Sequence, residues 1–183
     1  MKGTLFIVAT PIGNLDDITF RAVEILKSID IVLAEDTRHS KKLLKHLNIA
    51  KPIRAFHEHN EREKTKTIID ELHSGESIAL ISDAGTPLIS DPGYFLVAQA
   101  KKEGLRVVPI PGASALITAL SASGLASDSF TFLGFLPSKK TARVKLLKSL
   151  INRTETSIFY ESPKRILATL TDMHRIFGDN REV

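Results

Sequence analysis

The chain has 183 residues, 43% of them apolar, and a formal net charge of +4. This composition is that of a globular protein, long enough for one sizeable core or for one domain and part of another. The absence of cysteine excludes disulfides, thiol catalysis and Cys-ligated zinc. No apolar run approaches the roughly 20 residues that cross a bilayer, and the N-terminus has no signal-peptide layout. We therefore expect a soluble, cytoplasmic protein with no membrane partner.

The charge is unevenly distributed along the chain. Residues 1–136 contain 15 Lys/Arg and 16 Asp/Glu, a net charge of −1, whereas residues 137–183 contain 10 and 5, a net charge of +5. A solvated lysine face would account for the second value. A binding surface for a polyanion, confined to the second part of the chain, would account for it equally well.

Short apolar runs rich in β-branched residues alternate with helical periodicity in the first two thirds of the chain. The runs are typical of buried parallel strands. We expect these strands at residues 5–9, 31–34, 53–56, 78–82 and 107–110. The apolar stripes between them predict helices over residues 18–29, around 43–47, from about 60 to 75, from about 91 to 104, and over 114–123.

Two of these helices carry recognisable start signals. Asn60 and Glu63 have the spacing of a capping box, in which each side chain bonds to the other residue's backbone N–H. Asp91 followed by Pro92 is typical of an N-cap and the first helical position.

The alternation predicts an α/β fold with a doubly wound, mostly parallel five-stranded sheet over residues 1–124. Residues 125–129 are small and polar enough to form a linker. Residues 130–183 then predict a second, basic α/β domain with only two strands and two helices, which make a poor independent core. We therefore expect this second domain to be incomplete. Its elements are predicted at residues 130–135, 141–152, 156–160 and 163–177.

Four polar or glycine-rich turns follow predicted strands, at residues 9–14, 35–38, 82–87 and 111–114. Open parallel sheets bind ligands beyond the carboxyl ends of their strands, so these turns predict one site drawn from distant parts of the sequence. Neither the dinucleotide fingerprint nor the P-loop motif is present. The first turn carries Pro11, which has no N–H for a phosphate, so it forms either a pocket wall or a simple strand-to-helix turn.

The turn Glu35-Asp36-Thr37-Arg38 has two interpretations that its spacing does not separate. One is a helix N-cap with an internal ion pair. The other is a polar floor that orients a hydroxyl group or accepts its proton. On the second interpretation Glu35 or Asp36 is the proton acceptor, and Arg38 orients it or balances its charge.

His57 and His59 follow the third predicted strand. A His-x-His pair binds metal only with further ligands, and the sequence places none, so we expect no metal site. Helix capping together with a substrate-facing His57 or Asn60 explains this segment better.

The segment 82–93 is the strongest signal for a site. It holds two Gly, two Pro and two Asp between a buried strand and a predicted helix. A plain connection of this kind takes only about two to six residues. A longer, conformationally constrained loop at a strand end is more often a binding site. The small residues at 111–114 would let a ligand approach the backbone closely.

Several motifs together make the chain resemble the ribosomal RNA small-subunit methyltransferase I family, which methylates the 2′-hydroxyl of a cytidine in 16S rRNA and belongs to the tetrapyrrole (class III) methylase superfamily. The resemblance covers the whole chain in order. The motifs lie at residues 9–18, 35–38, 59–61, 85–93, 111–114, 134–137 and 160–165.

This resemblance implies a tetrapyrrole-methylase-like fold of two α/β domains, with S-adenosylmethionine in the cleft between them. It also implies a homodimer and, because family members are longer, an incomplete second domain. By position, the cofactor contacts fall on Pro11, Ile12, Asp83, Gly85, Thr86, Ile89, Ser114, Ala115, Tyr160 and Glu161.

With 16S rRNA or the small ribosomal subunit as partner, the basic second part of the chain is expected to contact phosphates. The expected contacts are Lys139, Lys140 and Arg143 first, and Lys164 and Arg165 second. Two other functions remain open: a small-molecule methylase acting on a tetrapyrrole, and a non-catalytic domain that binds a nucleotide or RNA.

Overall fold

The computed structural model describes residues 2–182 and contains two compact units, which divide between Ala115 and Leu116. The residues expected to form a linker, 125–129, lie in the second unit together with most of the helix before them. Among residues 2–182, no helix combines the length and the apolarity needed to cross a bilayer.

The first unit is built on a five-stranded sheet in the order β3-β2-β4-β1-β5, and every recorded pairing within it is parallel. The predicted α/β fold with a mostly parallel five-stranded sheet is therefore confirmed, and each strand lies within one residue of its expected bounds. The strands are β1 (Thr4–Val8), β2 (Ile31–Ala34), β3 (Ile53–Ala55), β4 (Ile78–Ile81) and β5 (Arg106–Ile110).

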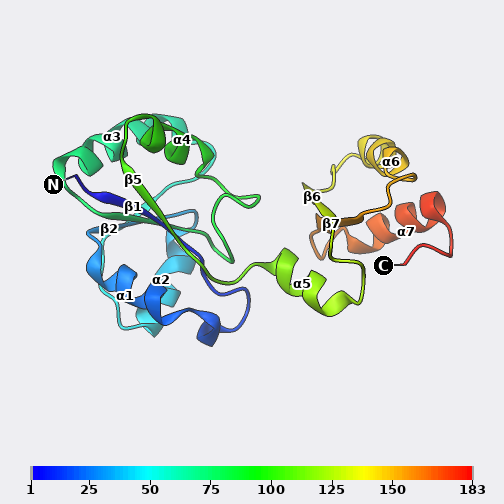
Figure 1. Ribbon diagram of the computed structural model, residues 1–183, viewed down its shortest axis with the longest axis horizontal. Coiled ribbons are helices and arrows are strands. Elements are labelled where there is room, and N and C mark those ends of the chain that lie inside the picture. The colour runs from blue at the N-terminus through cyan, green and yellow to red at the C-terminus, as the bar shows by residue number, and fades with distance from the viewer. Residues whose placement is uncertain (1, 183) are drawn as a thin grey trace. The chain divides into compact units, whose positions relative to one another are not determined.

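Helices cover both faces of this sheet. Figure 1 shows α3 and α4 on one side of it and α1 and α2 on the other. Alternate residues of β4 point to opposite faces of the sheet. Ile78 and Leu80 pack in the cluster that includes residues of α3 and α4. Ala79 and Ile81 pack in the cluster that includes residues of α1 and α2. Such burial on both sides explains why the strands are continuously apolar. The helices are α1 (Phe20–Ser28), α2 (Thr37–His46), α3 (Glu61–Ser74) and α4 (Tyr94–Lys102).

The expected capping box at the start of α3 is wrong. The Asn60 side chain makes no capping bond to the helix. Its Oδ1 instead accepts the backbone N–H of His57 at 2.9 Å, and its Nδ2 donates to the carbonyl of Ala55 at 3.3 Å. Asn60 thus closes the turn between β3 and α3, a local bond that competes with capping. The end of α3 is as expected, because Gly75 adopts the left-handed conformation (φ 108°).

The expected cap at Asp91 is also wrong, because α4 begins at Tyr94 and takes its cap from another helix. Oε1 of Glu61, on the first turn of α3, accepts the N–H groups of Gly93, Phe95 and Leu96 at 3.1, 2.8 and 3.3 Å. The first N–H groups of a helix have no acceptor within that helix, and these three donors lie at such an N-terminus. One carboxylate therefore joins the N-termini of two neighbouring helices.

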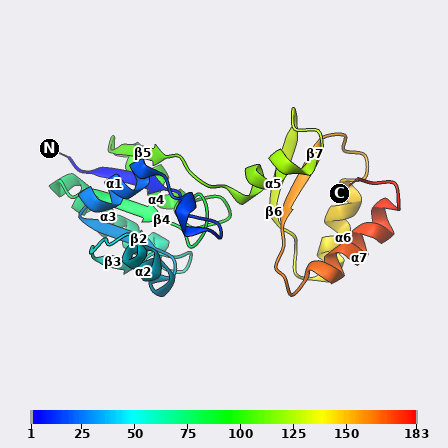
Figure 2. The same cartoon turned by 90° about the horizontal axis from the view of Figure 1, so that it is seen from below.

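The second unit contains a parallel strand pair, β6 (Phe130–Phe135) and β7 (Thr156–Tyr160). Its helices are α5 (Ala115–Ser123), α6 (Lys140–Ser149) and α7 (Ile166–Phe177). Figure 2 shows α6 and α7 side by side next to this strand pair. The Tyr160 ring contacts the rings of Phe132 and Phe135 edge-on, with centroids 4.8 and 5.6 Å apart.

A hollow of about 780 Å³ lies within the second unit. Residues of α5, β7 and α7 line it, among them Leu120, Phe159, Leu170 and Phe177. Apolar side chains of this unit therefore border the hollow.

Glu61→Ala should lower the free energy of unfolding of the first unit by about 1–2 kcal/mol, because three helix N–H groups lose a charged acceptor. Urea unfolding followed by circular dichroism measures the change. Glu63→Ala is the matched control, since Glu63 is exposed on the same turn of α3. An equal loss in both variants would show that helix propensity, not the shared cap, is responsible.

Candidate functional site

The loop after β4 is hydrogen-bonded to the segments that follow both β1 and β5. Thr10 N donates to the carbonyl of Gly85 at 2.9 Å, and Gly85 N donates back to the carbonyl of Thr10 at 3.0 Å. On the other side, Oγ1 of Thr86 donates to the carbonyl of Ala113 at 3.0 Å. Three of the four turns singled out in the sequence therefore meet at one edge of the sheet.

The start of this loop is buried and fully bonded. Oγ1 of Thr10 donates to the carbonyl of Ser82 at 3.1 Å, and Oγ of Ser82 donates to the carbonyl of Gly85 at 2.8 Å. Both side chains are buried. Since a buried hydroxyl without a partner would be costly, these bonds hold the loop in one conformation.

The loop contains four residues with positive φ, two of which are not glycine. Gly85 and Gly93 have φ values of 85° and 129°, and two non-glycine residues, Leu88 (72°) and Ser90 (65°), also have positive φ. Positive φ is uncommon for non-glycine residues and costs energy. Surrounding contacts must therefore impose this shape, as is typical of a binding loop.

Two glycines allow close approach at this edge of the sheet. A Cβ on Gly93 would lie 2.6 Å from Cδ2 of Leu80, and one on Gly112 would lie 2.8 Å from Cβ of Ala9. Both positions are too tight for a larger residue. Packing alone therefore requires glycine at positions 93 and 112, in addition to any role in admitting a ligand.

The ten residues expected to contact the cofactor fall in both units. Those from Pro11 to Ala115 belong to the first unit, whereas Tyr160 and Glu161 belong to the second. Within the first unit, Ile12 lies against Gly85, since its Cγ2 is 3.4 Å from where a Cβ of Gly85 would be. Pro11 and Gly85 are buried, and Ile89 is exposed.

Glu161 is bound tightly within its own unit. Its carboxylate accepts the N–H of Ser162 at 2.8 Å and the hydroxyl of Thr169 at 2.7 Å, and it forms an ion pair with Arg165. Its side chain is 5% exposed. Burial alone would raise its pKa, but the bonds from Thr169 and Ser162 and the charge of Arg165 hold the pKa below its usual value. The carboxylate is therefore ionised and largely occupied.

Asp36 and Arg38 are occupied with each other, which is the capping interpretation left open by the sequence. Asp36 accepts the backbone N–H of Arg38 at 2.8 Å and its guanidinium at 2.9 and 3.2 Å. These hydrogen bonds lower the pKa of Asp36 to about 2. A carboxylate with so low a pKa is a poor proton acceptor near neutral pH.

Three carboxylates gather where β2 and β4 end. Oδ1 of Asp83 accepts the backbone N–H of Asp36 at 3.1 Å, which joins the two strand ends. Burial raises the pKa of Glu35, the charge of Asp83 raises it further, and His57 opposes the shift. Burial, followed by the charges of Glu35 and Asp83, raises the pKa of Asp91 to about 6. This edge of the sheet therefore has a negative potential that would favour a cation.

Sequence reasoning did not place Asp91 in this group, because the dipeptide with Pro92 matched a helix start. The only available signal was its position on the same loop as Asp83.

His57 lies against the side chain that closes the turn between β3 and α3. Its Nε2 is 3.0 Å from Nδ2 of Asn60. Among residues 2–182, the buried Nδ1 has no hydrogen-bond partner. The rings of His57 and His59 are 6.0 Å apart. No group of three or more His, Asp or Glu residues in the described part of the chain is arranged to hold a metal ion.

Arg143, expected to contact phosphate, is buried instead. Its Nε and NH2 donate to Oδ2 of Asp172 at 3.0 and 2.7 Å, and the side chains of Arg143 and Asp172 are 6% and 4% exposed. The guanidinium therefore cannot reach a ligand on the surface. Sequence spacing missed this role because Asp172 lies 29 residues further along. Lys139, Lys140 and Lys164 are exposed, and Arg165 is paired with Glu161.

The first unit is thus a parallel α/β domain whose loop after β4 is held in one conformation and carries carboxylates at the edge of the sheet. The sequence profile of the Tetrapyrrole (Corrin/Porphyrin) Methylases matches residues 4–183, and the chain belongs to this family.

Bacterial proteins named "Ribosomal RNA small subunit methyltransferase I" are similar to nearly the whole chain. The one from Haemophilus influenzae is 56% identical over 183 residues, 100% of this chain and 65% of its own length. The one from Vibrio cholerae is 58% identical over 98% of this chain and 62% of its own length. The one from Pseudomonas aeruginosa is 57% identical, with 98% and 64% covered. The chain thus spans slightly less than two thirds of these relatives.

Two solved structures share the fold at low sequence identity. Native uroporphyrin III C-methyl transferase from Thermus thermophilus has a TM-score of 0.67 and 18% identity, over 98% of this chain and 79% of that one. Diphthine synthase has a TM-score of 0.65 and 13% identity, over 93% and 73%.

Arg143→Met should lower the stability of the second unit by about 3 kcal/mol, because it leaves the carboxylate of Asp172 buried without its main partner. The chain has two tyrosines and no tryptophan, so a Tyr94→Phe background leaves Tyr160 as the fluorescent reporter of this unit. Lys145→Met, at an exposed position of α6, is the control. Equal losses in both variants would contradict a stabilising role of the ion pair.

Asp91→Asn should make the protein more stable than wild type above pH 6, and the difference should shrink towards pH 4. The pKa of Asp91 is about 6 in the folded state, whereas the ordinary pKa of an Asp carboxyl group is 3.8. Wild-type stability therefore falls as pH rises through this window, and Asn removes the cost of ionisation. Thermal unfolding between pH 4 and 8 measures this. The exposed Asp70→Asn serves as control, and a pH-independent difference would contradict the explanation.

Proposed function

We propose that the protein transfers a methyl group from S-adenosylmethionine to the 2′-hydroxyl of a cytidine in 16S rRNA. The observation that carries this proposal is the similarity to proteins named for small-subunit rRNA methylation, at 56–58% identity over 98% or more of the chain. The solved structures, at 18% identity or less, support the fold alone. From the same resemblance we propose a cytoplasmic homodimer that acts on the small ribosomal subunit.

The residues at the sheet edge fit this cofactor in their charge. S-adenosylmethionine supplies an electrophilic methyl group on a positively charged sulfur. Glu35, Asp83 and Asp91 raise the negative potential at this edge, as the raised pKa values of Glu35 and Asp91 indicate. The loop beside them is held in one shape by its bonds to Thr10 and Ala113. We propose that Pro11, Ile12, Asp83, Gly85, Thr86, Ile89, Ser114 and Ala115 contact the cofactor, with Tyr160 and Glu161 contributed by the second unit.

Glu35 is the better of the two candidate proton acceptors. A general base works best when its pKa lies near the working pH. Burial and Asp83 raise the pKa of Glu35, whereas the Arg38 bonds lower that of Asp36 to about 2. We therefore propose that Glu35 accepts the hydroxyl proton. Asp36 and Arg38 position Glu35. The backbone N–H of Asp36 donates to Asp83, and the carboxylate of Asp36 caps the N-terminus of α2 by accepting the N–H of Arg38.

The deciding experiment is methyl transfer from labelled S-adenosylmethionine to three acceptors: 30S subunits, free 16S rRNA and uroporphyrinogen III. Mapping the product by nuclease digestion distinguishes ribose from base methylation. Label on a cytidine ribose is expected. Label on the tetrapyrrole alone would assign a small-molecule methylase, and no binding of S-adenosylmethionine by calorimetry would overturn both enzymatic functions.

Glu35→Gln should slow single-turnover methylation by about 10²–10⁴-fold, because a positioned base contributes a factor of this size. Asp36→Asn should stay near the wild-type rate, since Asn caps a helix as well as Asp does. In the wild type the rate should rise with pH as Glu35 loses its proton. Near-wild-type rates in both variants would exclude either carboxylate as the base.

S-adenosylmethionine should bind more tightly as pH rises from about 5 to 7, because Asp91 ionises with a pKa of about 6 and strengthens the negative potential. Its product, S-adenosylhomocysteine, has a neutral sulfur and should change less. Calorimetric titrations of both ligands at three pH values test this. An identical pH dependence for the two would contradict attraction between the carboxylates and the sulfonium.

A further inference from the structure

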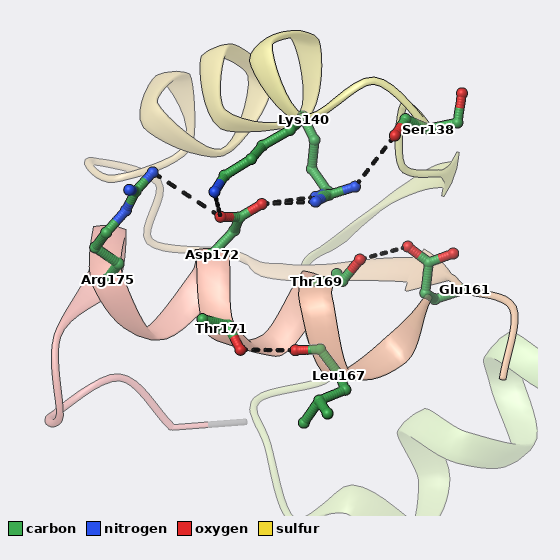
Figure 3. A network of polar contacts seen from close by, with 9 residues as sticks. Ser138, Lys140, Glu161, Leu167, Thr169, Thr171, Asp172 and Arg175 are labelled. Carbon is green, nitrogen blue, oxygen red and sulfur yellow. Dashed lines mark hydrogen bonds and ion pairs between the residues drawn. The ribbon is translucent and has the colours of Figure 1, made fainter. Parts of the chain in front are cut away.

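The carboxylate of Asp172 organises a cluster of cations between α6 and α7. Its side chain is 4% exposed. Oδ2 accepts both hydrogen bonds from Arg143, while Nζ of Lys140 and NH2 of Arg175 each lie 3.9 Å from the other oxygen, Oδ1 (Figure 3). Three cations thus surround one anion, which leaves the cluster with an excess of two positive charges.

The excess charge faces solvent on two side chains. Lys140 and Arg175 are 67% and 61% exposed, in contrast to the buried Arg143. At 3.9 Å neither nitrogen forms a hydrogen bond to Oδ1. Their donors therefore remain available to a ligand, while attraction to the buried carboxylate limits where the two side chains lie.

The geometry suits a phosphate group. Because both nitrogens lie within 3.9 Å of the same oxygen atom, they are close enough to contact one phosphate together. Arg binds phosphate through paired N–H groups, and Lys does so as a point charge. Lys140 is also the first residue of α6, whose N-terminus has no side-chain cap, so its partial positive charge adds to the attraction.

We propose that Lys140 and Arg175, positioned by the buried Asp172, form a contact point for the phosphate backbone of RNA. This inference rests on the proposed function, from which it takes RNA as the polyanion. It adds Arg175, which no sequence pattern indicated, and it replaces Arg143, whose charge is used internally. Asp172 is a positioning residue in this arrangement, and the two exposed cations make the contact.

The test is the salt dependence of binding to a 16S rRNA fragment, measured by fluorescence anisotropy at several KCl concentrations. The double variant Lys140→Gln/Arg175→Gln should bind more weakly. Its slope of log K against log[salt] should be smaller by about 1.4–1.8, since each lost phosphate contact changes the slope by about 0.7 in single strands and 0.9 in duplexes. The control Lys101→Gln/Lys102→Gln removes two exposed charges of α4 in the first unit and should leave the slope unchanged.

Each outcome has a distinct meaning. Tyr160 fluorescence in the Tyr94→Phe background checks that the second unit of each variant is folded. An unchanged slope in Lys140→Gln/Arg175→Gln, or an equal change in the control, overturns the inference while leaving the proposed function standing. Binding of the wild type to RNA without methyl transfer overturns the proposed function, yet a reduced slope still supports the contact point. Equal loss of binding to anionic lipid vesicles and to RNA would show a non-specific charge effect and overturn the inference.

Discussion

The position of β4 between β1 and β2 is the constraint on which the first unit depends. Because all the recorded pairings are parallel, the three strands end at the same edge, and the loops that follow them must share it. The loop after β4 bonds to Thr10 behind β1, and Asp83 at its start bonds to Asp36 behind β2. Segments more than forty residues apart in the sequence are thereby held in one rigid edge.

This arrangement forces like charges together. Glu35 and Asp83 follow adjacent strands, and Asp91 lies on the loop of Asp83. The charge of Asp83 therefore opposes the ionisation of Glu35, and the charges of Glu35 and Asp83 oppose that of Asp91. Such repulsion lowers the stability of the folded state, and sites that carry it are commonly functional. A bound cation would relieve the repulsion. The cost in stability and the affinity for a sulfonium would then have one physical origin.

The sequence predicts the elements of this fold well but not their non-local bonds. Strand bounds follow from continuous apolar runs such as 31–34, a local property, and they agree with the structure to within one residue. Two expected N-caps, at Asn60 and Asp91, do not agree. The N-terminus of α4, for example, is capped by Glu61, about thirty residues earlier in the chain. Local patterns at Asn60 and Asp91 suggested caps that the tertiary structure supplies in another way.

In the candidate site too, the sequence predicts where residues lie but not which non-local contacts they make. The position of the turns follows from strand order, but the choice between a catalytic and a capping role for Asp36 requires the distance to Arg38. The raised pKa of Asp91 likewise depends on Glu35, which lies on a different strand end. Spacing alone contains neither piece of information.

In the basic second part of the chain, the net charge follows from the sequence, but the side chains that carry it at the surface do not. Residues 137–183 carry a net charge of +5, and their internal ion pairs remove equal numbers of both signs. Arg143, Arg153 and Arg165 each pair with a carboxylate. The excess positive charge is therefore carried by other side chains, which are exposed and most of which are lysines. These are Lys139, Lys140, Lys145, Lys148, Lys164, Arg175 and Arg181.

Arginine, with its planar fork of donors, forms the internal ion pairs of this segment, and lysine supplies most of the charge that faces solvent. A polyanion would thus meet a surface of mobile point charges, except at Arg175 and Lys140, where a buried carboxylate restrains both.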